Sequence, residues 1–344
     1  MQAEVSIIMP VYNAERYLDA SIGSVLSQDF RDIELICFND ASTDGSAELL
    51  RSYAARDERV RVIDSKENVK QGAGRNRGLR EARGRYVMFL DADDMLAAGA
   101  VGSCVAAARE KDADVVFFNY ATFAGADSGD SSKIAAGSVR EISTLGHDAC
   151  ELGHEELRLR VAQRTASVWS AMYRRELFFD NDIFFPEKVF YEDNAIALAL
   201  QLSGRRPVMV DKALYLYRVD NVSVSRSDNN PRFFDRIGSA ETLMGHLKRL
   251  GHYGRFAKEV DYVFINQYLV ETVFGAVYRF DKARTDKIRE VRAGIRHYVP
   301  DFRKNPYYKA QPLKRRLKVE IHLRMPRVVK MLSNINRRIH GRGS

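Results

Sequence analysis

Residues 86–94 read YVMFLDADD, an apolar run that leads directly into three aspartates within four positions. A short run rich in apolar and aromatic residues is typical of a buried β-strand. The carboxylates of Asp91, Asp93 and Asp94 repel one another, and each raises the pKa of its neighbours unless a cation lies among them. The stretch therefore predicts a buried strand that ends at a site for a cation.

Three earlier apolar runs, at residues 5–12, 33–40 and 60–64, are each followed by a helical or glycine-rich segment. Strands that are apolar throughout and alternate with helices indicate a parallel sheet covered on both faces. Ligands of such sheets bind outside the carboxyl ends of the strands. Residues 10–13, 39–40 and 91–94 lie at those ends, so we expect three polar clusters to line one crevice.

The mixed α/β pattern continues through an apolar run at residues 115–120 to about residue 225, and the chain is helix-patterned beyond it. Glycine and serine are frequent in residues 125–138, which predicts a loop. We expect one domain over residues 1–225, with halves at 1–100 and 101–225. A helical region is expected over residues 226–344.

The composition is that of a globular protein: 344 residues, 45% hydrophobic and 29% charged. Three scattered cysteines are too few for a disulfide framework, which favours a reducing, cytoplasmic compartment. The N-terminus has no cationic segment and its apolar stretch stops at Pro10, unlike a signal peptide. No window approaches the roughly 18 uninterrupted apolar residues that a membrane span requires.

The Asp-x-Asp motif of Asp91, Ala92 and Asp93 suits a divalent cation that holds a diphosphate. Carboxylate oxygens are natural ligands of Mg²⁺ and Mn²⁺, and Mg²⁺ usually completes its shell with waters and phosphate. This metal would be the cation that the three aspartates need. The alternative is an acidic cap for a helix that begins after Met95.

Two further clusters allow a ligand role and a structural one. Asp40 can accept a hydrogen bond from the imide N–H of uracil, whereas Ser42, Thr43 and Asp44 are typical N-cap residues for the following helix. Tyr12 offers a flat surface for a base or ribose, or it is an aromatic side chain packed at the end of a strand.

The glycine-rich stretch GAGRNRG, at residues 72–78, lacks the G-x-G-x-x-G form and does not directly follow a strand. We therefore do not expect a dinucleotide site there. Arg75 at the start of a helix would meet a phosphate, or it belongs to a solvated basic face.

The tetrapeptide YEDN, at residues 191–194, precedes a helical pattern. Glu192 and Asp193 would be favoured at this place by the helix dipole alone. A carboxylate with a tunable pKa, within hydrogen-bond reach of its proton, can also serve as a general base.

Seven segments in this order resemble family 2 glycosyltransferases of the GT-A fold, and they extend from residue 5 to about residue 225: VSIIMPVYN, ELICFNDASTDGS, ENVKQGAGRNRGL, YVMFLDADD, VWSAMYRREL, FYEDN and LYLYRVDNVSVS. The resemblance implies an α/β nucleotide-diphospho-sugar transferase fold, with a nucleotide-binding half, an acceptor-side half and a helical C-terminal extension. The chain lacks the Q-x-x-R-W motif, which implies a non-processive enzyme.

The resemblance also implies roles for individual residues. The residues that would hold the UDP part of the donor are Pro10, Tyr12, Asn13, Asp40, Asn68, Arg75, Asp91 and Ala92. Asp93, together with Asp91, would bind Mn²⁺ or Mg²⁺, and Asp193, with Glu192 beside it, would be catalytic. Trp169 and Arg218 would lie on the acceptor side. Ala41 replaces a glycine that is frequent in the family, which slightly tightens the loop beside Asp40.

The implied reaction moves a hexose-type sugar from a UDP-sugar to a hydroxyl of a glycan or lipid-linked acceptor, in cell-surface polysaccharide synthesis. Asp193 would take the proton of the acceptor hydroxyl as its oxygen attacks the anomeric carbon. A single displacement would invert the configuration at that carbon.

The net charge of +8 originates in the tail, where residues 303–344 hold thirteen Lys and Arg and a single acid, Glu320. Pro326 would break or kink a helix there. A basic amphipathic segment suits an anionic membrane surface at the inner face of the cell membrane. The alternatives are a basic helix packed on the domain and a contact with a second subunit.

Two other functions fit parts of the sequence. A sugar-1-phosphate nucleotidyltransferase would also use aspartates and a metal, but its Gly-rich loop after the first strand is absent. A nucleic-acid-binding protein would explain the basic tail, but it would leave the acidic motifs without a role. We therefore expect no nucleic-acid partner.

Overall fold

A computed structural model describes residues 3–125, 140–142, 150–151, 153, 157, 161, 167–220 and 227–340. The loop expected at residues 125–138 and the end of the segment LYLYRVDNVSVS lie largely outside these residues. The chain forms two compact units. The first comprises Met1–Leu157 and Ala166–Asn221, and the second comprises Arg158–Thr165 and Val222–Ser344.

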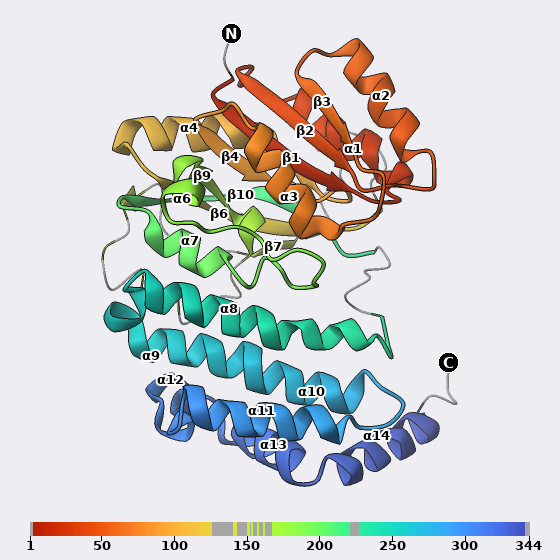
Figure 1. The fold of residues 1–344 in the computed structure, drawn as a ribbon, viewed down its shortest axis with the longest axis vertical. Helices are drawn as coiled ribbons and strands as arrows, with labels where there is room; N and C mark the ends of the chain where they lie inside the picture. Colours follow the sequence, from red (N-terminus) through yellow and green to blue (C-terminus); the bar gives the residue numbers. More distant parts are fainter. Residues whose placement is uncertain are drawn as a thin grey trace. The chain divides into compact units, whose positions relative to one another are not determined.

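The first unit is built on one mixed β-sheet (Figure 1). Its strands, in spatial order, are β3 (Val60–Asp64), β2 (Ile33–Asn39), β1 (Val5–Val11), β4 (Tyr86–Phe89), β9 (Ala171–Arg174), β6 (Val115–Phe123), β10 (Pro207–Arg218) and β5 (Met95–Leu96). Two short strands lie off this path: β7 (Arg140–Ile142) pairs with β6, and β8 (Cys150–Glu151) pairs with β10.

The four strands expected from the apolar runs are parallel to one another, since β1 pairs in parallel with β2 and β4, and β2 with β3. Strands β6 and β10 form a further parallel pair. Strand β9 then lies antiparallel between β4 and β6. Because β1, β2 and β4 run in the same direction, their carboxyl ends meet at one edge, as the sequence predicts.

Helices cover both faces of this sheet. They are α1 (Glu15–Leu26), α2 (Ser46–Arg56), α3 (Lys70–Glu81), α4 (Ala100–Lys111), α6 (Glu176–Asp180), α7 (Ala197–Ser203) and the 3₁₀ helix η3 (Val168–Ser170). Successive residues of a strand point to opposite faces. Ile7 and Met9 of β1 share a core with Leu18 and Ile22 of α1, whereas Ile8 points to α3.

The glycines of the GAGRNRG stretch let α3 approach its neighbours closely. A Cβ atom at Gly72 would overlap the carbonyl oxygen of Pro186, and one at Gly78 would overlap the side chain of Ile8. The whole stretch is helical, which agrees with the absence of a dinucleotide-binding loop. The glycines therefore serve packing, and they bring residues 186–192 against α3.

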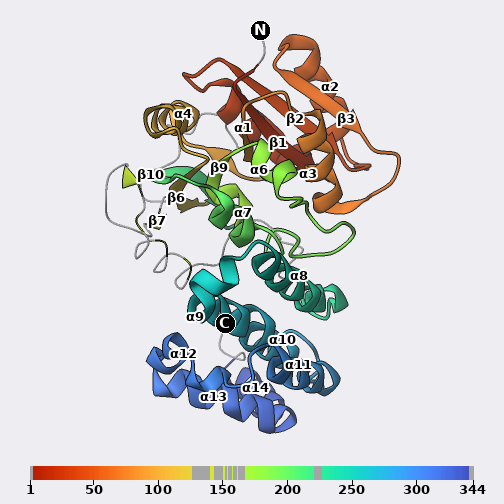
Figure 2. The ribbon, with the colours of Figure 1, turned by 60° about the vertical axis from the view of Figure 1, so that its left-hand side comes forward.

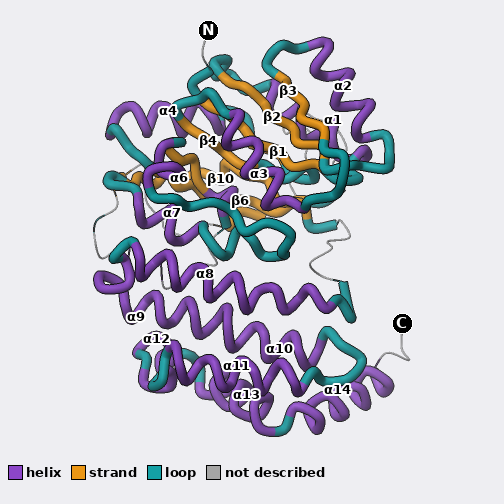
Figure 3. The backbone as a smooth tube through the Cα atoms, viewed as in Figure 1, coloured by secondary structure: helices purple, strands orange, loops and turns teal. Residues whose placement is uncertain are grey.

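The second unit is helical among its described residues, and Figure 3 shows that the described strands all belong to the first unit. Its elements are η5 (Pro231–Phe234), α8 (Asp235–Arg249), α9 (His252–Phe264), the π-helix η6 (Ile265–Val270), α10 (Glu271–Tyr278), α11 (Thr285–Tyr298), η7 (Phe302–Lys304), α12 (Pro306–Ala310), α13 (Leu313–Arg324) and α14 (Pro326–His340). α9, η6 and α10 follow one another without a gap, and Figures 1 and 2 show this run of helix between α8 and α11.

Pro326 is the first residue of α14, so the predicted break falls between α13 and α14. No helix among the described residues is both long and apolar enough to cross a membrane.

Candidate active site

The loops that follow β1 and β2 are joined by hydrogen bonds at Asn13. The side-chain oxygen of Asn13 accepts from the N–H of Thr43 at 2.7 Å, and the N–H of Asn13 donates to the hydroxyl of Ser42 at 3.1 Å. Pro10 is buried within β1, whereas Tyr12 is 49% exposed. The ring of Tyr12 is therefore accessible, which argues against the alternative of an aromatic side chain packed at the end of the strand.

Asp40 holds the beginning of α3. Its two carboxylate oxygens accept from the N–H groups of Val69 and Lys70, at 2.6 and 2.8 Å, and the residue is only 3% exposed. Each carboxylate oxygen keeps a second lone-pair site. The side chain of Asn68 donates to the Asp40 carbonyl at 3.2 Å, and the side-chain oxygen of Asn68 is buried without a partner.

The N-cap of α2 is Gly45, without a side-chain cap bond, so none of Ser42, Thr43 and Asp44 takes the predicted cap position. The nearest of them is Asp44. Its carboxylate accepts from the N–H of Ser46 at 3.0 Å, where α2 begins. Ser42 and Thr43 instead bond to Asn13.

The three aspartates after β4 form a turn, not a helix cap. Met95 begins the short strand β5, and the next helix starts at Ala100, so the capping alternative is wrong. The buried carboxylate of Asp94 accepts from the N–H of Arg218 at 2.8 Å and from the hydroxyl of Tyr215 at 2.7 Å. Burial, followed by the charges of Asp93 and Asp91, raises the pKa of Asp94 well above its usual value. Ala92 is buried within the same turn.

Arg218 supports this turn from β10. It is 1% exposed, and its Nε donates to the carbonyl of Asp93 at 2.9 Å. Its guanidinium lies over the rings of Tyr17 and Phe123, 4.9 and 4.6 Å from their centroids. Arg218 therefore contacts the backbone that carries the Asp-x-Asp motif.

Trp169 reaches the same turn through Tyr215. Its ring stacks on Tyr215 with centroids 4.5 Å apart and planes at 20°, and the Tyr215 hydroxyl bonds to Asp94. Sequence reasoning did not single out Tyr215. Its signal is the alternation of leucine and tyrosine in the segment ALYLY, which places Tyr215 and Tyr217 on one face of β10.

A cation does lie among the acids, and it is Arg75 of α3. Its Nη2 is 2.7 Å from Oδ1 of Asp91, and its Nη1 bonds to Oε1 of Glu192. Arg75 is 2% exposed, so the interpretation as a solvated basic face is wrong. It lies in the second turn of α3 and not at the start. Burial alone would lower the pKa of Arg75, but the charges of Asp91, Glu192 and Asp193 outweigh it and raise the pKa.

Asp193 lies in the turn before α7, beside this cluster. Burial, followed by the charge of Glu192, raises the pKa of Asp193 to about 7, against the opposing effect of Arg75. Its carboxylate accepts from the N–H of Asn194 at 2.8 Å. A carboxyl group with such a pKa can gain or lose a proton near neutral pH.

The loop that leads to Glu192 and Asp193 is fixed by Asn76 of α3. The side-chain amide of Asn76 donates to the carbonyl of Phe185 at 2.9 Å and accepts from its N–H at 3.0 Å. Sequence reasoning missed this residue. The sequence feature that could have identified Asn76 is an amide side chain in the middle of a helix, next to Arg75. A polar side chain at such a position needs a hydrogen-bond partner if it is buried.

The acids of this site fit a metal only with help from another ligand. Among the described residues, no three His, Cys, Asp or Glu side chains are grouped to hold a metal ion. Asp91 is already paired with Arg75. One or two carboxylates suit a Mg²⁺-type ion that keeps waters and takes phosphate oxygens from a substrate. The donor set thus fits a metal that arrives with a diphosphate.

Comparison with known proteins gives a consistent result. Residues 6–180 match the family profile described as Glycosyl transferase family 2. The uncharacterized glycosyltransferase EpsJ of Bacillus subtilis is 30% identical over 73% of this chain and 70% of its own length.

Two solved structures resemble the fold. TarS of S. aureus, in a crystal structure of its residues 1–349 with UDP-GlcNAc, has a TM-score of 0.65 at 21% identity, over 89% of both chains. The mannosyltransferase PcManGT of Pyrobaculum calidifontis, in complex with GDP-Man and Mn²⁺, has a TM-score of 0.51 at 16% identity, over 96% of this chain and 88% of its own. The GT-A fold implied by the sequence resemblance is confirmed, and the chain belongs to glycosyl transferase family 2.

Proposed function

We propose that this glycosyltransferase moves a hexose-type sugar from a UDP-sugar to a hydroxyl group of a glycan or a lipid-linked saccharide, with inversion at the anomeric carbon. The observation that carries the proposal is the cluster of Asp193, Glu192, Asp91 and Arg75 at the carboxyl edge of the sheet, in which the pKa of Asp193 is about 7. A base with this pKa is matched to proton transfer near neutral pH.

The uridine is proposed to bind at the ends of β1 and β2. Tyr12 has an exposed ring for the base or ribose, and Asn68 has a buried oxygen without a partner. Asp40, with a second lone-pair site on each carboxylate oxygen, would accept from the uracil imide. Pro10 and Asn13 would shape the pocket, with Asp91, Ala92 and Arg75 on the diphosphate-sugar side. The UDP-GlcNAc complex of TarS supports a UDP-sugar as the donor.

Asp93, with Asp91 beside it, is proposed to hold Mn²⁺ or Mg²⁺ together with the diphosphate. When bound, the metal would offset the negative charge that develops on the departing diphosphate. The Mn²⁺ complex of PcManGT supports a metal in a protein of this fold. Arg218 would keep the backbone of Asp93 in place through its bond to the Asp93 carbonyl.

Asp193 is proposed to accept the proton of the acceptor hydroxyl while the acceptor oxygen forms its bond to the anomeric carbon. The bond from that carbon to the diphosphate breaks on the opposite side, UDP leaves with the electron pair, and the configuration inverts. Glu192, held by Arg75, places a negative charge beside Asp193 and so raises the pKa of Asp193, which makes its carboxylate form a better proton acceptor. Trp169 would offer its ring to the acceptor.

The place of action is proposed to be the inner face of the cell membrane, in the synthesis of a cell-surface polysaccharide. Cys37 and Cys104 are buried thiols without disulfide partners, in agreement with a reducing compartment. The membership in glycosyl transferase family 2 favours this activity over the nucleotidyltransferase and nucleic-acid-binding alternatives.

Calorimetric titration of UDP tests the donor site, with Mn²⁺, without metal, and with Mn²⁺ on the Asp93→Ala variant. We expect metal-dependent binding that the substitution abolishes. Asp180→Ala is the control, because Asp180 is an exposed carboxylate at the end of α6, and it should leave binding unchanged. Absence of UDP binding under every condition would refute the proposed donor site. Transfer from a panel of UDP-sugars, followed by release of UDP, then identifies the sugar.

A further inference from the structure

Exposed apolar side chains are concentrated on the last two helices. Among the described residues, eleven large hydrophobic side chains are exposed, and eight of them lie between residues 313 and 335. They are Leu313, Leu317, Ile321, Met325, Val328, Met331, Leu332 and Ile335. The spacing of four residues on α13, and of three and four on α14, places each set along one helical face. A pattern that normally marks a core face therefore lies in solvent.

The opposite face of α13 is packed within the second unit. Val319 and Leu323 are buried, and His322 bonds to α10. Its Nδ1 lies 2.6 Å from the carbonyl of Lys318 and must be the donor there, so Nε2 accepts from the hydroxyl of Tyr278 at 2.7 Å. The tail thus packs on α10 through one face and presents a second, apolar face outward.

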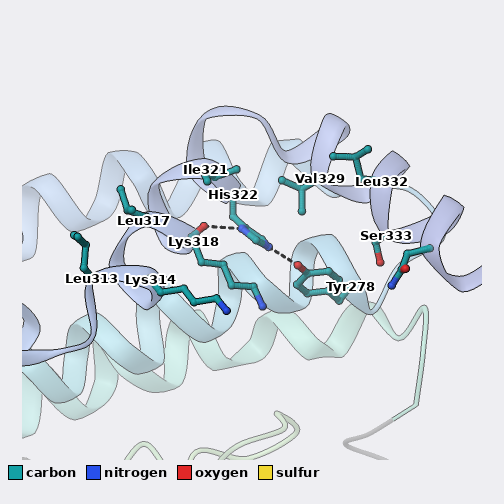
Figure 4. Close-up of a pocket in the computed structure, with 11 residues that line it drawn as sticks. Tyr278, Leu313, Lys314, Leu317, Lys318, Ile321, His322, Val329, Leu332 and Ser333 are labelled. Carbon is teal, nitrogen blue, oxygen red and sulfur yellow. Dashed lines mark hydrogen bonds between the residues drawn. The ribbon is translucent and has the colours of Figure 1, made fainter. Parts of the chain in front are cut away.

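A groove with a volume of about 1070 Å³ lies between α13 and α14 beside this outward face, and His322 and Tyr278 also line it (Figure 4). Leu317 and Ile321 of α13 and Leu332 of α14 contribute apolar walls. Lys314 and Lys318 extend from α13 on the side of Tyr278, so ammonium groups border the apolar surface. The groove joins apolar and cationic groups on one surface.

The charge around this face has one sign. Residues 313–340 contain nine Lys and Arg and a single acid, Glu320. That acid is already paired, at 2.7 Å with Arg303 and at 3.7 Å with Arg324. Two copies of the chain would bring like charges together if they met through this face. An anionic partner is electrostatically favoured instead.

We propose that the face formed by α13 and α14 docks on the surface of an anionic phospholipid bilayer. The apolar side chains enter the boundary between headgroups and acyl chains, and the surrounding lysines and arginines meet the lipid phosphates. This docking rests on the tail alone and does not require the proposed sugar transfer.

Co-sedimentation with vesicles tests the docking. We expect the intact chain to bind vesicles of phosphatidylcholine mixed with phosphatidylglycerol, and not to bind vesicles of phosphatidylcholine alone. Binding should weaken as the salt concentration is raised. Three exposed charges beside the apolar side chains are removed by Lys314→Gln, Arg324→Gln and Arg327→Gln. This variant should bind on the order of a hundredfold more weakly. The matched control removes three exposed charges from α11 by Arg289→Gln, Arg292→Gln and Arg296→Gln, and it should bind nearly as well as the wild type.

A second variant tests the apolar part, with Leu317→Asn, Ile321→Asn and Leu332→Asn. These side chains are at least half exposed, so the fold should survive, and vesicle binding should fall at constant charge. Failure of the wild type to bind anionic vesicles would overturn the proposal. So would a dimer, seen by light scattering without vesicles, that the second variant dissociates. Unchanged UDP titration of both variants separates a failure of docking from a failure of the donor site.

Discussion

Arg75 and Glu192 are 117 positions apart in the sequence, yet the guanidinium of one bonds to the carboxylate of the other. The same guanidinium pairs with Asp91 at 2.7 Å. One arginine of α3 therefore links the turn after β4 to the turn before α7. Because this arginine is buried, its two partners depend on it for charge compensation.

Replacement of Arg75 should damage both stability and activity. Arg75→Ala leaves two carboxylates without their cation, and breaking a buried pair in this way costs about 3–5 kcal/mol. Arg75→Lys keeps the charge but loses the two-pronged geometry, so we expect a smaller loss of stability and a large loss of transfer rate. Chemical denaturation and UDP-release assays measure the two effects. Wild-type transfer by the lysine variant would show that the geometry of Arg75 is dispensable.

The transfer rate should depend on the protonation of Asp193. Since the pKa of Asp193 is about 7, the rate should rise with pH through this value and then level off, as the carboxylate form accepts the acceptor proton. Asp193→Asn should lower the rate by roughly a hundredfold or more at every pH. A pH profile of kcat/KM for both proteins tests this. A wild-type profile that is flat between about pH 5 and 9 would exclude Asp193 as the base.

The raised pKa of Asp193 also affects stability: the free energy of unfolding should fall as pH rises, whereas the transfer rate should rise. The folded chain holds the Asp193 proton up to a pKa of about 7, whereas the usual value is 3.8. The folded state therefore binds more protons than the unfolded state between these values, and the contribution of Asp193 to stability falls as pH rises through them. Asp193→Asn removes the charged form, so its free energy of unfolding should exceed that of the wild type above pH 7 and approach it below pH 4. Denaturation of both proteins across this range measures the difference, and a difference independent of pH would contradict it.

The sequence could predict the strands and the edge at which the site lies, because apolar runs and strand ends are local features. It could not predict that Arg75 is buried, since its partners Asp91 and Glu192 come from distant segments. The capping interpretation after Met95 failed for a related reason. Met95 pairs with Leu216 of β10, and this long-range pairing overrides the local signal for a helix start.

Asp40 illustrates the limit for individual side chains. Its place at the end of β2 follows from the pattern, but its bonds to the N–H groups of Val69 and Lys70 require the fold. Asp40 therefore has a structural role that no local pattern indicated, in addition to the proposed contact with uracil. Substitution at Asp40 would disturb α3 as well as the donor site.

Tyr215 should stabilise the aspartate turn through its hydroxyl group. Tyr215→Phe removes the donor to the buried carboxylate of Asp94, and an unsatisfied buried acceptor costs about 1–3 kcal/mol. The control is Tyr120→Phe, which makes the same chemical change at the residue opposite Tyr215 on β6. Urea denaturation should show the larger loss for Tyr215→Phe. Equal losses for the two variants would mean that the bond to Asp94 contributes little.

Gly72 should be needed for activity although it takes no part in the chemistry. A methyl group at this position would overlap the carbonyl oxygen of Pro186 and approach Glu192, so Gly72→Ala should push the loop that carries Glu192 and Asp193 away from α3. We expect a large loss of transfer rate with UDP binding better preserved. The proposed contacts with uridine come from the loops after β1 and β2, and not from the loop that carries Glu192 and Asp193. The control is Gly245→Ala in the middle of α8, where nothing lies near the added methyl group. Removal of a glycine from a helix interior stabilises it by up to about 1 kcal/mol, so this variant should be as active as the wild type and slightly more stable. Full activity of Gly72→Ala would show that the close approach of the loop to α3 is not required.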